Sequence, residues 1–430
     1  MTVNGPTTAF QGVVVVGAGP VGLLIALRLA QAGIRVQVLE KNPDLSDAPR
    51  ASGYFGGALL ALKKAGILDK ALSLGFAGRG IAWRKPLADD GLGNKRMGDI
   101  LAHLSFPRDS TTLDGTDAIL YLRQSVLSEL IFDEALRSGL VEVHFNMELV
   151  GLENQPDSVV ATARGSDGTT RLFRGSFLVG ADGGKSAVRK HLGIPFKGHT
   201  WPEKLVAIDV LTEGAAPDPQ FPTSMIIHPI HFGVITPLEK PQEGEKTLFR
   251  CAVALDPKDT RSDEELLSED SLSSLLGEMM PGPRPLPARV VRSSPYRIHQ
   301  LCASTFHRGR CILAGDAAHL NNPVGALGLT TGILDAEAAA DALELIINEG
   351  KQLEALRIYS HARQKAFQTF VNPVSTANKL RIANDPEAAT EDWFLRAMLD
   401  PTPETTEEFT KPFFGIWRTN MREEMRRRQL

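Results

Sequence analysis

Cysteine is scarce in this sequence. Among 430 residues there are three, at Cys251, Cys302 and Cys311, and their separations match neither a disulfide framework nor a zinc site. Disulfide bonds persist mainly in oxidising compartments, so a chain with so few cysteines fits a reducing one. We therefore expect free thiols, no metal site and a cytoplasmic location.

Charge of one sign and long apolar runs are also lacking. The formal net charge is −4, which gives no electrostatic reason to expect nucleic acid or an anionic membrane as a partner. The apolar run that starts at Val13 is interrupted by glycines and reaches Arg28 too soon to span a bilayer. We expect a soluble protein with no membrane span, and the length allows two or three domains.

The most informative stretch begins at Val13. Four consecutive valines predict a strand buried on both faces. Gly17, Gly19 and Gly22 follow at the spacing that permits a tight turn, close approach of a pyrophosphate and packing of a helix on the strand. A second strand ends at Glu40, whose carboxylate can accept ribose hydroxyls. The pattern predicts an adenine dinucleotide site for FAD or NAD, and a βαβ unit with packing glycines is the alternative.

Three polar residues lie at further positions where a ligand can bind. Arg50 follows the second strand in a loop, where it can bind a pyrophosphate or face solvent. Arg123 ends a short strand, the place where open α/β sheets bind ligands. Asp182 follows a buried strand at 177–179, and it can belong to a cofactor site or cap the helix expected at 186–192.

A third chemical stretch starts with a buried strand at 311–314. Its end brings Asp316 to the ligand-binding edge of the sheet. A glycine-rich loop then leads into a long helix that we expect to begin near Thr330. Free N–H groups at such a helix start can stabilise negative charge on a flat ring as well as on a phosphate.

The rest of the chain predicts an insertion of mainly antiparallel sheet. Its strands are expected at 204–211, 224–235 and 246–255, followed by a helix at 263–276. In the first half of the chain, apolar spacing predicts one helix over 58–74, and strands at 141–145 and 159–164 read as parts of a meander.

Three of these motifs together resemble the class A flavoprotein monooxygenases built like p-hydroxybenzoate hydroxylase. They are the glycine turn, Asp182-Gly183, and the sequence GDAAH from Gly315 to His319, and they span residues 13 to about 345. Fungal secondary-metabolite and salicylate-hydroxylase-like members are most similar, because they have Gly-Leu-Gly-Leu-Thr after the proline. This chain reads Gly-Ala-Leu-Gly-Leu-Thr, so Ala326 stands where the family has its second glycine.

The resemblance implies an α/β fold: a Rossmann-like FAD-binding domain with a βαβ unit, an inserted substrate domain of mainly antiparallel sheet, and C-terminal helices. The expected bounds are 11–75, 118–195 and 296–370 for the FAD-binding domain, 76–117 and 196–295 for the substrate domain, and 371–430 for the C-terminal helical segment. It also implies FAD as cofactor, NADH or NADPH as a transient co-substrate, and O2. Through a flavin C4a-hydroperoxide, such an enzyme hydroxylates or epoxidises an aromatic or polycyclic small molecule.

The same resemblance implies which residues contact FAD. Glu40 would bind the adenosine ribose, Arg50 and Arg123 the phosphate and ribityl region, and Asp316 a ribityl hydroxyl, while Pro323 would shape the oxygen pocket. The complete expected set is Gly17, Gly19, Gly22, Glu40, Arg50, Arg123, Asp182, Asp316, Pro323, Gly328, Leu329 and Thr330.

A catalytic acid or base is not evident from the sequence. A phenolic substrate reacts faster as its phenolate, so a base is expected, but none of the four tyrosines is placed as one. Besides Pro323, the catalytic candidates are His228 and His231, which either face the ring or lie on a solvent-facing strand, and Arg250, which could pair with a substrate carboxylate.

Other functions fit the same fold. An FAD-dependent reductase, isomerase or cyclase would keep the cofactor and change the chemistry. A halogenase is disfavoured, because the four tryptophans are isolated and form no Trp-x-Trp motif. A prenyl-protein binding module like the Rab escort proteins would not need Glu40, Asp182 and the GDAAH sequence. The oligomeric state, monomer or dimer, is left undetermined.

Overall fold

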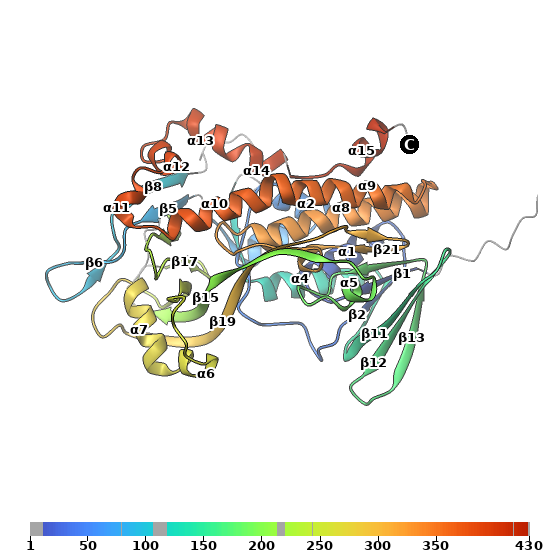
Figure 1. Ribbon diagram of the computed structural model, residues 1–430, viewed down its shortest axis with the longest axis horizontal. Helices are drawn as coiled ribbons and strands as arrows, with labels where there is room; N and C mark the ends of the chain where they lie inside the picture. The colour runs from blue at the N-terminus through green and yellow to red at the C-terminus, as the bar shows by residue number, and fades with distance from the viewer. Residues whose placement is uncertain are drawn as a thin grey trace, which may run out of the picture.

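The computed structural model describes residues 12–78, 80–105, 118–212, 220–242, 244–415 and 417–428. A parallel sheet covered by long helices lies beside a larger, mainly antiparallel sheet, and a row of shorter helices from the C-terminal part runs along one side of both (Figure 1). Within the described part of the chain, no helix combines the length and the apolar character needed to cross a membrane.

The parallel sheet has the strand order β10-β2-β1-β14-β21-β20, and only β20 runs antiparallel to its neighbour. All four residues of β1 are buried, because β1 is packed against both the helix at Pro20–Gln31 and the strand at Thr170–Gly175. The strands are β1 (Val13–Val16), β2 (Val36–Leu39), β10 (Val141–His144), β14 (Phe177–Gly180), β20 (His307–Arg308) and β21 (Cys311–Leu313).

One expectation about this sheet is wrong. The strand at 141–145 is not part of a meander, since β10 pairs with β2 at the edge of the parallel sheet. The meander consists of β11 (Met147–Asn154), β12 (Val159–Gly165) and β13 (Thr170–Gly175).

Helix α1 (Pro20–Gln31) packs against α4 (Gln124–Arg137) and α8 (Leu327–Glu349). The single helix expected over 58–74 is two helices, α2 (Gly57–Lys64) and α3 (Leu68–Leu74). The chain turns between them at Gly66, whose φ of 74° lies in the left-handed region where helices end.

The second sheet has the order β22-β19-β15-β18-β17-β16-β5-β8, and only β16 and β5 are parallel. It confirms the inserted, mainly antiparallel sheet, although β5 and β8 come from before the insertion. The strands are β5 (Gly80–Arg84), β8 (Ile100–Ser105), β15 (Phe196–Thr212), β16 (Thr223–Ile226), β17 (Gly233–Pro237), β18 (Thr247–Ala254), β19 (Ala288–Ala303) and β22 (His319–Leu320).

Several shorter elements lie between the strands of the two sheets. The expected helix at 263–276 is divided into α6 (Asp263–Leu266) and α7 (Glu269–Met279), because Ser268 caps a second helix start. The others are β3 (Gly53–Tyr54), β4 (Phe76–Gly78), β6 (Ala88–Asp89), β7 (Lys95–Arg96), β9 (Ile119–Tyr121), α5 (Ala187–His191) and the 3-10 helix η1 (Gly315–Ala317).

The C-terminal part is helical, as expected. After α9 (Glu354–Ala366), a π-helical turn, η2 (Phe367–Val371), leads into α10 (Asn372–Ile382) without a break. The last helices are α11 (Pro386–Ala389), α12 (Trp393–Ala397), α13 (Pro403–Thr410), α14 (Pro412–Gly415) and α15 (Met421–Arg427).

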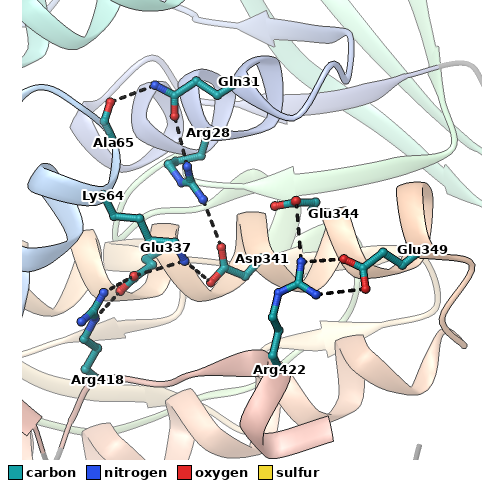
Figure 2. A network of polar contacts seen from close by, with 10 residues as sticks. All are labelled: Arg28, Gln31, Lys64, Ala65, Glu337, Asp341, Glu344, Glu349, Arg418 and Arg422. Atoms are coloured by element: carbon teal, nitrogen blue, oxygen red, sulfur yellow. Dashed lines mark hydrogen bonds and ion pairs between the residues drawn. The ribbon is translucent and has the colours of Figure 1, made fainter.

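Charged side chains fasten this C-terminal part to α8 (Figure 2). Arg418 donates to both carboxylate oxygens of Glu337, at 2.9 and 2.6 Å, and Lys64 of α2 lies 3.4 Å from the same carboxylate. One turn along α8, Asp341 pairs with Lys64 at 2.6 Å and with Arg28 of α1 at 3.3 Å. The helix is thereby fixed to α1, α2 and the end of the chain.

Candidate functional site

The turn between β1 and α1 has the geometry of a phosphate cradle. A Cβ on Gly17 would lie 2.4 Å from the Ala181 carbonyl oxygen, and one on Gly22 would lie 2.1 Å from the Gly17 carbonyl oxygen. A Cβ on Gly19 would meet no atom within 4 Å, so this glycine borders open space. Among the described residues, no side chain caps the start of α1. Its first amides can therefore bind a pyrophosphate at the open side of Gly19.

Glu40 lies against this cradle at the carboxyl end of β2. Its Oε2 accepts a hydrogen bond from the Ala18 amide at 2.9 Å. Its Oε1 accepts from the backbone and side-chain nitrogens of Asn42 at 2.9 and 2.7 Å. The carboxylate is thus held next to the glycine turn, where the ribose of an adenine dinucleotide would lie.

Arg50 and Arg123 lie on neighbouring segments. The amide of Gln124, which follows Arg123, donates to the carbonyl of Ala51 at 3.0 Å. Both arginine side chains are exposed, so their guanidinium groups can turn toward a ligand. Arg50 also lies close enough to Asp316 for its positive charge to oppose the rise in the Asp316 pKa that burial causes.

Asp316 is at the end of β21, in η1. Its side chain reaches solvent although protein surrounds it, and burial raises its pKa above the ordinary value, while His319 and Arg50 oppose that shift. The structure thus brings together two predicted cofactor residues, Asp316 and Arg50, that are far apart in the sequence.

A buried ion pair supports the turn that carries Asp316. Asp335 of α8 accepts hydrogen bonds from the Gly315 amide at 3.0 Å, from His319 Nε2 at 2.6 Å and from Arg363 Nε at 2.6 Å. Burial alone would raise the pKa of Asp335, but His319 and Arg363 outweigh it and the pKa is lowered. His319 therefore has the structural role of holding this loop.

Sequence reasoning missed Asp335 and Arg363. Asp335 could have been suspected, because it is an acid within an otherwise apolar segment of a buried helix. Its partner Arg363 lies on another helix and also donates to the Trp417 carbonyl, a contact that no local pattern reveals.

The start of α8 lies three residues earlier than expected. Gly325 and Ala326 adopt φ of 99° and 54°, and α8 begins at Leu327 rather than near Thr330. No side chain in the described part of the chain caps this start, so first-turn amides, including those of Gly328 and Leu329, are available to a ligand. Thr330 comes at the end of that turn, and its hydroxyl donates to the Ala326 carbonyl at 2.7 Å.

The loop that carries Pro323 is held by buried polar contacts. Gln300 Oε1 accepts from the Asn322 amide at 3.0 Å, and Asn322 Nδ2 donates to the Ser375 carbonyl at 2.9 Å. The Val324 amide donates to Asn322 Oδ1 at 3.0 Å. Pro323 thus lies between two fixed residues, next to the start of α8.

Arg250 and Asp182 are engaged in contacts within the protein. Arg250 makes a paired contact with Asp209, at 2.7 and 2.8 Å, and also donates to the Arg50 carbonyl. These bonds occupy the donors that a substrate carboxylate would need, and they fix the Arg50 loop to the antiparallel sheet. Asp182 accepts from the amides of Ala187 and Val188, at 2.6 and 3.1 Å, so it caps α5.

The histidine candidates stabilise a turn. His228 Nδ1 accepts from the Ile230 and His231 amides at 3.0 and 2.8 Å, and His231 Nδ1 lies 3.0 Å from the Ala254 carbonyl oxygen. Burial and the neighbouring His231 lower the pKa of His228, so it stays neutral at pH 7. Both residues belong to the turn between β16 and β17 and not to the solvent-facing strand given as the alternative.

The tyrosines are unsuited to act as bases. Burial raises the pKa of Tyr296 to about 12, although Arg250 and Arg50 oppose the shift. Burial also raises the pKa of Tyr54, Tyr121 and Tyr359 above the ordinary value.

Comparison with known proteins agrees with this geometry. A family model described as an FAD binding domain matches residues 11–373. The para-nitrophenol 4-monooxygenase of Pseudomonas sp. strain WBC-3 is 36% identical over 372 residues, which are 86% of this chain and 86% of that protein. The 6-hydroxy-3-succinoylpyridine 3-monooxygenase HspB of Pseudomonas putida is 32% identical and covers 89% of this chain and 92% of its own.

Solved structures give the same result. The p-nitrophenol 4-monooxygenase PnpA from Pseudomonas putida DLL-E4 superposes with a TM-score of 0.83 at 32% identity, over 96% of this chain and 99% of that one. A ternary complex of aklavinone-11 hydroxylase with FAD and aklavinone superposes with a TM-score of 0.75 at 25% identity, over 92% and 72% of the two chains. The glycine cradle, Glu40 and the uncapped start of α8 fit a bound FAD, and this chain belongs to the class A flavoprotein monooxygenases and is an FAD-dependent monooxygenase.

Proposed function

We propose that this monooxygenase hydroxylates a small phenol. The observation that carries the proposal is the full-length similarity to para-nitrophenol 4-monooxygenase, since 86% of each chain is aligned at 36% identity. A relative aligned only over the FAD-binding segments would say nothing of the substrate, but 86% of this chain is more than those segments contain.

The cofactor contacts follow from the site geometry. The amides at the start of α1 would bind the pyrophosphate, Glu40 the ribose, Asp316 a ribityl hydroxyl, and the Gly328 and Leu329 amides the pyrimidine edge of the flavin. When bound, FAD supplies a hydride acceptor for NADH or NADPH and, once reduced, the means to activate O2. We assign Thr330 a smaller part, because its place at the end of the first turn suits an ordinary helical hydrogen bond.

The protein's own contribution is to orient the ring and exclude water. A buried apolar cluster of the antiparallel sheet contains Trp83, Phe232 and Val324, with Trp201 and Tyr296 packed against it. Val324 is next to Pro323, so this cluster adjoins the flavin loop. An apolar surface here would shield the reacting oxygen from water, which protects a reactive intermediate from hydrolysis.

Turnover with the purified, FAD-loaded protein tests the proposal. Para-nitrophenol and a panel of phenols are added with NADH or NADPH, and O2 uptake, hydroxylated product and hydrogen peroxide are measured. We expect a phenol to accelerate NAD(P)H oxidation with product formed and little peroxide released. FAD-loaded protein whose oxidation of NADH and NADPH is indifferent to every phenol would refute the substrate class.

The division into domains at the bounds given above also stays a proposal, with one modification: β19 runs without a break from Ala288 to Ala303, so we move the boundary at 295 to the end of that strand. The cytoplasmic location and the choice between monomer and dimer stay predictions.

A further inference from the structure

A bulge in β15 places two polar residues beside α10. The pairing of β15 with β19 shifts register between Thr200 and Lys204, so residues 201–203 leave the ladder. Bulges often re-aim side chains next to active sites. Here Trp201 and Glu203 both contact Lys379, which comes from the middle of α10.

Lys379 is a buried cation with an unusual set of neighbours. Its Nζ lies 2.6 Å from Glu203 Oε1, 4.3 Å from the ring centre of Trp201 and 5.2 Å from that of Phe232. Only 4% of the Lys379 side chain and 13% of the Glu203 side chain are exposed. A buried ion pair contributes little to stability compared with apolar packing, which suggests a functional reason for it.

Two polar atoms of this group lack a partner. Glu203 Oε2 and Trp201 Nε1 are buried and make no hydrogen bond to any residue that the structure describes. A buried polar atom without a partner destabilises the fold unless a ligand or water satisfies it. Glu203 Oε2 is a hydrogen-bond acceptor and Trp201 Nε1 is a donor. A phenolic hydroxyl offers the complement of both, because it donates its proton and accepts a hydrogen bond at the same oxygen.

The group adjoins the flavin loop. Trp201 and Phe232 pack in the same apolar cluster as Val324, the neighbour of Pro323. Asn378, next to Lys379, lies close to Gly325: a Cβ on Gly325 would be 2.7 Å from Asn378 Nδ2. The helix that carries Lys379 therefore contacts both the antiparallel sheet and the loop at the start of α8.

We propose that Glu203, Lys379 and Trp201 bind the substrate hydroxyl and that Glu203 removes its proton. This inference rests on the proposed function. The phenol O–H bond breaks, the proton bonds to Glu203 Oε2, and the electron pair stays on the phenolate oxygen. The negative charge moves from Glu203 to the substrate, where the Lys379 ammonium still balances it and the Trp201 N–H donates to it. No tyrosine is needed as a base.

The test uses the FAD-loaded enzyme and para-nitrophenol, whose phenolate absorbs visible light. Difference spectra over a pH series report the ionisation of the bound phenol, and kcat and kcat/KM are measured over the same series. For Glu203→Gln we expect the bound phenol to ionise at higher pH than in the wild type. We also expect turnover to fall by on the order of 10²-fold where the free phenol is protonated, with a smaller deficit at higher pH.

Matched variants separate this chemistry from folding. Glu391→Gln changes an exposed acid paired with Arg396 and should behave as wild type. Glu203→Gln leaves Lys379 buried without its anion, so the double variant Glu203→Gln/Lys379→Met, with neither charge, serves if the single variant fails to fold. This double variant should retain FAD and lose the absorption of the bound phenolate. Trp201→Phe should raise the pH of ionisation without changing FAD content.

The outcomes are distinguishable. A wild-type enzyme that no phenol stimulates overturns the proposed function. A wild-type enzyme that turns over para-nitrophenol, with a Glu203→Gln variant of unchanged pH profile and unchanged phenolate spectrum, overturns this inference alone. A double variant that holds FAD and still ionises the bound phenol as the wild type does has the same meaning.

Discussion

The buried Asp335 offers the most demanding test of how the cofactor site is supported. In Asp335→Asn the carboxylate between His319 and Arg363 becomes a neutral amide, while Arg363, itself fully buried, keeps its charge. Removing one partner of a buried ion pair typically costs about 3–5 kcal/mol. With an unfolding entropy of about 2.1 cal/mol/K per residue, that loss corresponds to a fall in Tm of roughly 3–6 °C for a chain of this length if it unfolds cooperatively.

Asp341→Asn is the matched control, because it makes the same change six positions further along α8. The Asp341 side chain is 16% exposed and pairs with Lys64 and Arg28, so its replacement should cost less than that of the fully buried Asp335. Thermal unfolding and FAD content of both variants are compared with the wild type. Equal stability of the two variants, or full FAD retention by Asp335→Asn, would refute the reasoning.

The same pair fixes the sign of a pH effect. The folded protein lowers the pKa of Asp335, so its contribution to stability is present above the unfolded-state pKa of about 3.9 and is lost as the pH falls through the lower folded value. The difference in Tm between wild type and Asp335→Asn should therefore be constant near pH 7 and shrink below about pH 4. A difference that grows in acid would contradict the pairing.

Three further predictions concern the cofactor loops. Gly19→Ala should fold with wild-type stability and lose FAD, because its Cβ would meet no described atom within 4 Å. Gly17→Ala should destabilise the fold itself, since the φ of Gly17 is 107° and its Cβ would lie 2.4 Å from the Ala181 carbonyl oxygen. Equal unfolding midpoints of the two variants would contradict this. Asp316→Ala should weaken FAD retention, measured by flavin absorbance after gel filtration, and unchanged flavin content would rule out its assigned contact. Ala326→Gly should raise stability by up to about 1 kcal/mol by relieving a left-handed alanine, and a lower Tm would show that the strain is absent.

The sequence anticipated those parts of the fold that local patterns determine. The glycine turn and its flanking strands are found where expected, because β-branched residues, glycine spacing and an apolar helix all act within 28 residues. The start of α8 was misplaced, since the turn at Gly325 and Ala326 lets the helix begin before the threonine that resembles the family motif.

Pairings between distant segments were beyond local patterns. β10 has the alternation of a meander strand, yet it pairs with β2 more than a hundred residues away. β19 was not predicted at all, because most of its first half is exposed or half-buried and gives no apolar alternation. Glu203 and Lys379 were likewise passed over, since their contact joins a strand bulge to a helix about 176 positions later.

The contacts made by Trp417 and Arg418 have a consequence for how the enzyme acquires its cofactor. Arg363 donates to the Trp417 carbonyl, and Arg418 donates to Glu337. The Trp417 carbonyl and the Arg418 side chain are synthesised after every strand of the parallel sheet. Until that stretch leaves the ribosome, the back of α8 carries buried charges without all their counterparts. We therefore expect chains halted before Trp417 to bind little FAD and to lack flavin absorption.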